Sequence, residues 1–226
     1  MAFYIDSAFL DDITNTARTV PCAGVTTNPT ILLAAQERGQ LLAPGEVLEH
    51  LLRIVEGDIF MQPGASEEEE MYAQAMSYIQ ADALRVIPKI PMNHIGMRVA
   101  RRLKAQRYRI AFTAVVTIAQ AYSAALISTD FVIPYFNRME RSGIDAAQRI
   151  SEMADVLHNM QTTQTTGPTR ILTASIKTRE EAALALLAGS DDLAVTSELL
   201  LDLLTEALSA EAIERFAQDW QKMKKL

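Results

Sequence analysis

Short apolar runs alternate with longer amphipathic stretches along most of this chain. The amphipathic stretches, for example residues 91–107 and 178–188, repeat their apolar positions at the spacing of a helix. Such alternation is typical of βαβ units that build a parallel sheet. The apolar runs predict eight strands, at Phe3–Asp6, Ala23–Thr26, Asp58–Gln62, Arg85–Ile90, Arg109–Val115, Phe131–Phe136, Arg170–Ser175 and Asp192–Thr196.

Eight strands within about 200 residues predict an α/β fold of the (β/α)8, or TIM, barrel type. A doubly wound open sheet is the alternative that the same alternation allows. In that fold a Gly-rich turn after the first strand binds dinucleotides. Here Asp6-Ser7-Ala8 stands at that place, which argues against dinucleotide binding.

No stretch of the chain is rich enough in Gly, Pro or Ser to be a domain linker, so we expect residues 1–226 to form one domain. The polar stretch 161–168 (QTTQTTGP) predicts a loop between two elements. The pattern therefore favours a single barrel over two smaller domains.

The tail from Ser197 to Lys225 predicts a helical extension of the barrel, with residues 206–226 as a C-terminal helix. Ile213, Phe216 and Trp220 share one face of that helix. The face either packs on its own barrel or contacts another subunit, because aromatic residues are enriched at interfaces.

Composition narrows the function classes. With 21 Lys and Arg against 28 Asp and Glu, the formal charge is −7, which argues against nucleic-acid binding through bulk charge. The single cysteine, Cys22, excludes an internal disulfide, and the three scattered histidines predict no metal site. No apolar run approaches the roughly 18 residues of a membrane span. We expect a cytoplasmic enzyme without signal peptide, metal or cofactor.

One lysine stands in an unusual setting. Lys89 interrupts the apolar strand Val86-Ile87-Pro88-Lys89-Ile90. A lysine buried in an apolar barrel loses hydration, so its pKa falls, and the neutral amine becomes a nucleophile that forms a Schiff base with a carbonyl. The alternative is a lysine at a strand end that reaches water or a carboxylate.

Polar side chains stand at the ends of the other predicted strands as well. In a barrel these ends converge on one mouth, where such enzymes place their chemistry. The pattern therefore predicts a catalytic site built from several strands. The polar residues at these ends are Asp6, Thr26, Thr27, Asn28, Gln62, Thr113, Tyr135, Asn137, Arg138, Ser175, Lys177 and Thr196.

Several sequence blocks resemble the transaldolases and the related fructose-6-phosphate aldolases. The most specific is GVTTNPT at residues 24–30, which follows Asp6 at the family's spacing. The other blocks are weak singly and strong together, and they come in the family's order between Phe3 and about Leu204. They are VIPKIP at 86–91, TAV at 113–115 with Ala119-Gln120, PYFNR at 134–138 and ASIKT at 174–178.

The resemblance implies a class I aldolase that works without metal and forms its Schiff base at Lys89. Transaldolases resemble one another in having Glu at the end of strand three and Phe in the strand-six block. The aldolase branch is similar to this chain in having Gln62 and Tyr135 there. With no carboxylate at position 62, we expect a water held by Gln62, Thr113 and Tyr135 to relay protons.

Two segments depart from the aldolase branch. Val116-Thr117 stands where that branch usually has Tyr-Gly, and residues 139–143 lack the expected Asp-x-x-Gly-rich stretch. We expect these segments to line the mouth near the acceptor end, so they bear on the identity of the substrate more than on the Schiff base.

The function expected from these observations is cleavage or formation of a ketose phosphate, similar to fructose 6-phosphate, through dihydroxyacetone and an aldehyde such as glyceraldehyde 3-phosphate. Transfer of a dihydroxyacetone unit between sugar phosphates is the alternative, and a non-catalytic sugar-phosphate binder is a third. We expect Asp6 and Asn28 to handle the donor half and Thr26 to bind the substrate.

We expect Asn137 to line the substrate site. We expect Arg138, Ser175 and Lys177 to bind the terminal anion of the substrate. A sulfonate would satisfy the same donors as a phosphate. The resemblance also implies a ring-shaped homo-oligomer, a pentamer or a decamer of stacked pentamers, in which the C-terminal helix crosses to a neighbour.

Overall fold

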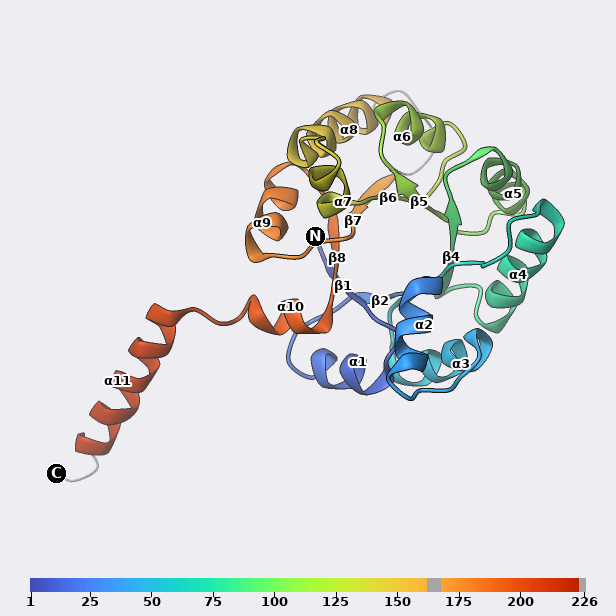
Figure 1. Cartoon of the computed structure of the whole chain (residues 1–226). Helices are drawn as coiled ribbons and strands as arrows, with labels where there is room; N and C mark the ends of the chain where they lie inside the picture. The colour runs from blue at the N-terminus through green and yellow to red at the C-terminus, as the bar shows by residue number, and fades with distance from the viewer. Residues whose placement is uncertain (162–167, 224–226) are drawn as a thin grey trace.

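The computed structural model describes residues 1–161 and 168–223. Eight parallel strands close into a barrel in chain order, with β1 paired to both β2 and β8 (Figure 1). This confirms the predicted (β/α)8 barrel over the open sheet. The strands are β1 Phe3–Asp6, β2 Gly24–Thr26, β3 Asp58–Met61, β4 Val86–Pro91, β5 Ala111–Val115, β6 Phe131–Pro134, β7 Arg170–Thr173 and β8 Asp192–Val195.

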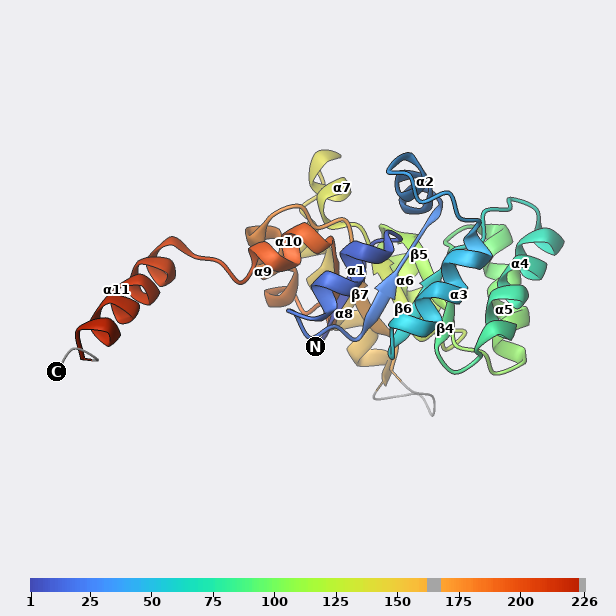
Figure 2. The same cartoon turned by 90° about the horizontal axis from the view of Figure 1, so that it is seen from below.

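Helices surround the barrel, and α2 and α7 rise above the carboxyl ends of the strands that precede them (Figure 2). They are α1 Leu10–Ala17, α2 Pro29–Glu37, α3 Pro44–Ile54, α4 Glu68–Ala81, α5 His94–Ala105, α6 Ile118–Ala125, α7 Phe136–Arg141, α8 Ala146–Gln161, α9 Arg179–Leu187, α10 Ser197–Asp202 and α11 Ala207–Met223. Residues 162–167 of the predicted loop lie outside the described residues.

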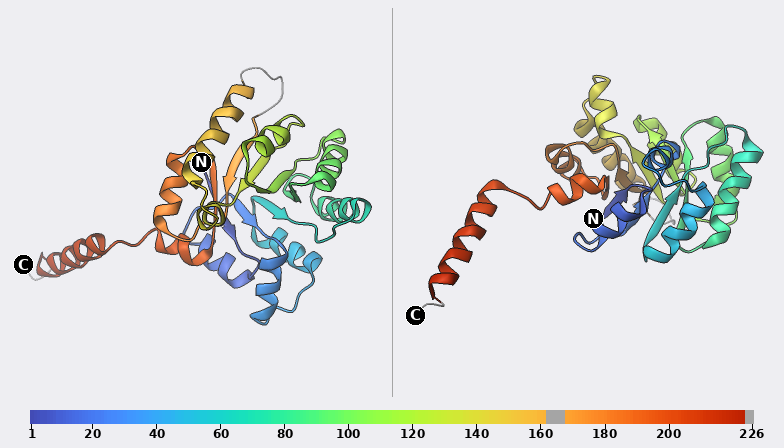
Figure 3. Two further views of the ribbon diagram at one scale, coloured as in Figure 1. Left: turned by 45° about the horizontal axis from the view of Figure 1, so that its top comes forward. Right: turned by 60° about the horizontal axis from the view of Figure 1, so that its bottom comes forward.

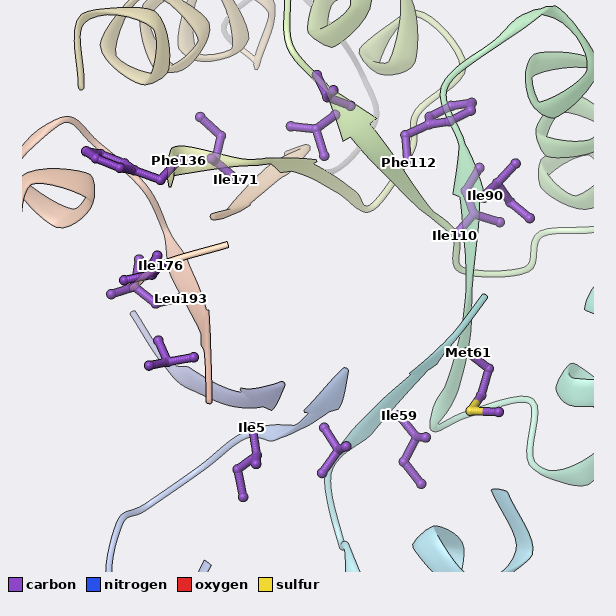
Figure 4. Packing of buried hydrophobic residues seen from close by; sticks show 14 of the residues in the cluster. Ile5, Ile59, Met61, Ile90, Ile110, Phe112, Phe136, Ile171, Ile176 and Leu193 are labelled. Carbon is purple, nitrogen blue, oxygen red and sulfur yellow. The ribbon is translucent and has the colours of Figure 1, made fainter. Parts of the chain in front are cut away.

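Strand alternation divides the apolar residues between two cores. The outer core lies between sheet and helices, and Ile5, Ile59 and Ile90 point into it, away from the barrel axis (Figure 4). The inner core fills the barrel with residues of the other parity, including Phe60, Ile87 and Ala194. Residues that continue this inner parity toward the carboxyl ends of the strands therefore face the mouth.

The amino-terminal end of the barrel is filled by aromatic rings. Tyr4, Phe60 and Phe131 pack edge to face, with ring centroids 5.1 to 6.5 Å apart. Burial and the nearby carboxylates of Asp58 and Asp192 raise the pKa of Tyr4. The phenol therefore stays neutral within this layer.

Two ion pairs complete this end of the barrel. Arg109 donates to both carboxylate oxygens of Asp58, at 2.8 Å each. Arg170 binds Asp192 in the same two-pronged way at 2.8 Å, and Asp192 is buried. A buried carboxylate needs such a partner, because its desolvation is otherwise uncompensated.

The predicted helical tail after Ser197 is present as two helices, α10 and α11, and residues 224–226 of the predicted C-terminal helix lie outside the described residues. Its first part is α10, which buries Leu199 and Leu200 against the barrel. The chain then leaves the helix, because the Arg179 side chain binds Asp202 and donates to the carbonyl of Thr205 at 2.7 Å. This guanidinium holds the turn before α11.

The last described helix, α11, extends away from the barrel (Figures 2 and 3). It buries none of its residues Ala207–Met223. Ile213, Phe216 and Trp220 are 65%, 64% and 55% exposed. This apolar face therefore does not pack on its own barrel, which was one of the two predicted alternatives. In the described part of the chain, no helix is long and apolar enough to cross a membrane.

Candidate active site

Lys89 lies inside the barrel near the carboxyl end of β4. Ile87, two residues earlier, belongs to the inner core, so strand alternation directs Lys89 to the barrel axis. The side chain is only 2% exposed. Burial lowers the pKa of Lys89 to about 8, and the charge of Asp6 opposes this shift in part. About a tenth of the amine is thus neutral and nucleophilic at pH 7, far more than for an ordinary lysine.

The other lysines of the described residues differ from Lys89. Lys104 binds Asp130 at 2.9 Å with its side chain only 19% exposed. The fold brings Asp130, which precedes β6, next to α5. Lys177 and Lys222 are exposed. Among described lysines, Lys89 alone is buried.

Asp6 at the end of β1 faces Thr26 at the end of β2. The two residues are paired in the sheet register, and the Thr26 hydroxyl donates to the Asp6 carboxylate. Thr26 is buried, which fixes the carboxylate at one edge of the mouth. A cavity of about 250 Å³ opens beside Asp6, with Ser7 and Thr196 in its lining.

Two hydroxyls meet at the carboxyl ends of the neighbouring strands β5 and β6. The oxygens of Thr113 and Tyr135 lie 2.6 Å apart, so one donates to the other. The pairing of β5 with β6 shifts register directly after Thr113, where Ala114 forms a bulge with a left-handed φ of 58°. The predicted pair is therefore brought together. Gln62, the third member of the predicted relay, lies partly exposed directly after β3.

The Thr-Thr-Asn-Pro block forms the junction between β2 and α2. Asn28 caps the helix, because its side-chain oxygen accepts from the backbone N–H of Ile31 at 3.0 Å. Pro29 stands in the first turn of α2, where its missing N–H costs nothing. The cap leaves the two amide protons of Asn28 available to a ligand.

The residues predicted to bind an anion lie around α7 and the segment after β7. Arg138 is exposed and stacks over the Tyr135 ring, 4.8 Å from the centroid. Ser175 adopts a left-handed φ of 59°, which costs about 1 kcal/mol for a residue with a Cβ. The backbone N–H of Asn137 donates to the Ser175 carbonyl at 2.9 Å.

The predicted strand ends were too long at this place. Strand β6 ends at Pro134 and β7 at Thr173. Phe136, predicted in a strand, begins α7. Its N–H bonds the Ala174 carbonyl at 2.9 Å, which turns the chain into the helix.

Asn137 has a partner that the sequence analysis missed. Its amide donates to the carboxylate of Glu181 on α9 at 2.7 Å. One side-chain N–H of Asn137 is thus used by Glu181. The predicted contact of Asn137 with the substrate must use its other N–H or its side-chain oxygen. The sequence signal for Glu181 is its place three residues after Thr178, the pattern of a helix capping box.

The departures from the family pattern have local structural roles. Thr117 caps α6 by accepting from the Gln120 N–H at 3.2 Å, and the Gln120 side chain accepts from the Thr117 N–H at 3.0 Å. Gly143, with a φ of 76°, follows the end of α7. Thr117 thus starts α6 directly after β5.

Barrels of this kind carry their chemistry at the carboxyl ends of the strands, and the desolvated lysine, the carboxylate and the hydroxyl pair all lie there. Fold and site together define an enzyme of the (β/α)8 barrel class. The sequence matches the Transaldolase/Fructose-6-phosphate aldolase family over residues 3–226. The chain therefore belongs to this family, as its motifs predicted, and it has the aldolase or transaldolase type of activity that the family defines.

Proposed function

We propose that this protein is a Schiff-base aldolase of the fructose-6-phosphate aldolase branch. It would cleave, or form in reverse, a ketose phosphate into dihydroxyacetone and an aldehyde such as glyceraldehyde 3-phosphate. The observation that carries this proposal is Lys89, the buried lysine whose pKa is lowered to about 8 inside the barrel mouth. Cytoplasmic sugar phosphates are the matching substrates, and nucleic acid is not among the proposed partners.

The reaction begins when the neutral amine of Lys89 attacks the ketose carbonyl and water leaves, which forms an imine, and uptake of one proton from solvent converts the imine to an iminium ion. Asp6 accepts the proton of the C4 hydroxyl as the C3–C4 bond breaks. The bonding electrons pass to the iminium nitrogen, which yields an enamine and a free aldehyde. The negative charge of the Asp6 carboxylate raises the pKa of Lys89, so Asp6 stabilises positive charge on the Lys89 nitrogen.

The next step separates the aldolase from the transaldolase. A water held by Gln62, Thr113 and Tyr135 would deliver a proton to the enamine carbon, after which hydrolysis frees dihydroxyacetone. The 2.6 Å contact between Thr113 and Tyr135 supports this relay. If the enamine instead waits for an aldehyde acceptor, the same site transfers the dihydroxyacetone unit.

Release of dihydroxyacetone tests the choice directly. The enzyme is incubated with fructose 6-phosphate, with and without erythrose 4-phosphate as acceptor. An aldolase releases dihydroxyacetone without the acceptor, and a transaldolase consumes the ketose only with it. A sugar-phosphate binder consumes nothing and is not trapped by borohydride.

Arg138→Ala should raise the KM for glyceraldehyde 3-phosphate roughly 10-fold or more, because a charge-assisted bond to phosphate is lost. The KM for unphosphorylated glyceraldehyde should stay the same. Arg141→Ala is the matched control, since Arg141 is exposed on the same helix. Equal effects of Arg138→Ala on both aldehydes would show that this guanidinium does not bind the anion.

The protein is further proposed to form a ring-shaped homo-oligomer in which α11 lies on a neighbouring subunit. The support is the exposure of Leu208, Ile213, Phe216 and Met223 on this helix, at 73%, 65%, 64% and 64%. Exposed apolar side chains in such number mark an interaction surface. A pentamer or a decamer is the assembly that the family resemblance implies.

Deletion from Ala210 onward should convert the oligomer to a monomer while the circular dichroism of the barrel persists. Phe216→Ser should weaken the assembly in the same direction, and Gln218→Ser on the same exposed helix should not. Light scattering measures the mass in each case. An intact protein that scatters as a 25.0 kDa monomer would contradict the proposed assembly.

A further inference from the structure

Glu181 joins the two segments that carry the proposed anion-binding groups. One carboxylate oxygen accepts from the Asn137 side chain at 2.7 Å, and the other accepts from the backbone N–H of Lys177 at 2.6 Å. Asn137 belongs to α7 after β6, and Lys177 belongs to the loop after β7. A single side chain from α9 thus holds both sides of this part of the mouth.

The Glu181 carboxylate does not make the hydrogen bond that is usual for its position in a helix cap. Thr178 caps α9 by accepting from the Glu181 N–H at 3.1 Å, and Glu181 occupies the position whose side chain usually returns to the backbone N–H of the cap residue. Here it bonds the N–H of Lys177, one residue earlier, and the amide of Asn137. The carboxylate therefore connects two loops in addition to starting a helix.

The connection leads directly to Arg138. Asn137 is held twice, by Glu181 through its side chain and by the Ser175 carbonyl through its N–H at 2.9 Å. Arg138 is the next residue and stacks over the Tyr135 ring. Arg138 is exposed, so the fixed backbone at Asn137 and the stacking on Tyr135 together limit where its guanidinium lies.

We propose that Glu181 is a positioning residue that sets Arg138 and the Ser175–Lys177 segment for the anionic end of the acceptor aldehyde. The proposal rests on the proposed function, in which these residues bind that anion. Glu181 does not touch the substrate. The negative charge of Glu181 repels an anion bound nearby and so weakens its binding. Glu181 improves binding of the anionic aldehyde only if its positioning of the binding groups outweighs this repulsion.

The direction in which the KM for the phosphorylated aldehyde changes therefore separates positioning from repulsion. Glu181→Ala should raise the KM for glyceraldehyde 3-phosphate about 10-fold, because two hydrogen bonds to a charged group are lost. The KM for glyceraldehyde and the rate of borohydride trapping at Lys89 should change less than about twofold. Glu180→Ala is the matched control, since Glu180 is an exposed carboxylate on the same helical turn.

Two further variants keep the test decisive. Glu181→Gln retains the shape and one acceptor oxygen, so it should fold and show an intermediate rise in KM. In the double variant Asn137→Ala with Glu181→Ala, the two effects should not multiply, because both changes remove the same bond. The melting temperature is recorded for every variant.

Three results would overturn the proposal: a lower KM for the phosphorylated aldehyde, an equal rise for both aldehydes, or a lower melting temperature with no selective change. Arg138→Ala tells which idea has failed. If Arg138→Ala is selective and Glu181→Ala is not, only the positioning role is lost. If Arg138→Ala is itself unselective, the proposed anion site is lost and the role of Glu181 with it.

Discussion

Lys89→Met is expected to abolish turnover and, at the same time, to make the protein more stable. Activity is lost because the nucleophile of the Schiff base is removed and Lys89 is the only buried lysine among the described residues. The reaction is followed as release of dihydroxyacetone from fructose 6-phosphate. Lys222→Met, at an exposed lysine on α11, is the matched control and should be fully active.

Borohydride reduction in the presence of the ketose identifies the nucleophile. Mass spectrometry of the digested protein should place the adduct on Lys89, and Lys89→Met should give none. An adduct on Lys104 or Lys177 would refute the assignment. The trapping rate should rise with pH through about 8, where the buried amine of Lys89 loses its proton.

The gain in stability follows from the same lowered pKa. The pKa of Lys89 is about 8 in the folded protein and 10.5 for an ordinary lysine, which corresponds to about 3 kcal/mol. Below pH 8 both states are protonated, so the folded state carries the full cost of burying the charge. Between pH 8 and 10.5 the unfolded state holds the proton and the folded state does not, so wild-type stability rises with pH.

We therefore compare the free energy of unfolding of the wild type and of Lys89→Met, measured by chemical denaturation at several pH values. The variant should be more stable by up to about 3 kcal/mol below pH 8, and this difference should shrink as the pH rises toward 10.5. A difference that is independent of pH would mean that packing, rather than the charge of Lys89, sets the change.

Asp6→Asn is expected to reduce kcat for cleavage by roughly 10²- to 10⁴-fold, the usual cost of removing a positioned acid–base group. The amide is similar in size to the carboxylate and can still accept a bond from Thr26. Loss of activity thus reports on proton transfer rather than on folding. Asp11→Asn, at an exposed carboxylate of α1, is the matched control.

The same variant should change the pH dependence of Lys89. The Asp6 charge raises the pKa of Lys89 against the larger effect of burial, so its removal should lower that pKa further. Borohydride trapping by Asp6→Asn should accordingly reach its plateau at a lower pH than in the wild type. Near-normal turnover, or an unshifted trapping profile, would remove Asp6 from the proposed mechanism.

Much of the site could be predicted from the sequence because its residues follow a two-residue period within strands. Lys89 shares parity with Ile87, and Thr113 shares parity with Ala111, so barrel closure brings both to one axis. The closure itself follows from repeated strand and helix patterns. Residues that extend such strands at their carboxyl ends are then expected at the mouth.

Contacts between distant side chains could not be predicted in the same way. Glu181 meets Asn137 across 44 positions, and local patterns mark Glu181 only as a helix cap. The break between α10 and α11 depends on Arg179, which lies on another helix. Lys104 binds Asp130, which lies 26 positions away in the sequence, only because the fold brings the two residues together. In each case tertiary placement decides the partner, and a helical or strand period contains no information about it.

The filled amino-terminal end of the barrel has a kinetic consequence. Tyr4, Phe60 and Phe131 fill that end, with Arg109 and Arg170 paired at its rim, so the proposed substrates reach Lys89 from the mouth at the carboxyl ends of the strands. In the proposed reaction, the departing aldehyde has to clear this mouth before an incoming aldehyde can reach the enamine. Substrates and products then occupy the passage one after the other, and a released aldehyde competes with the next one for the same route.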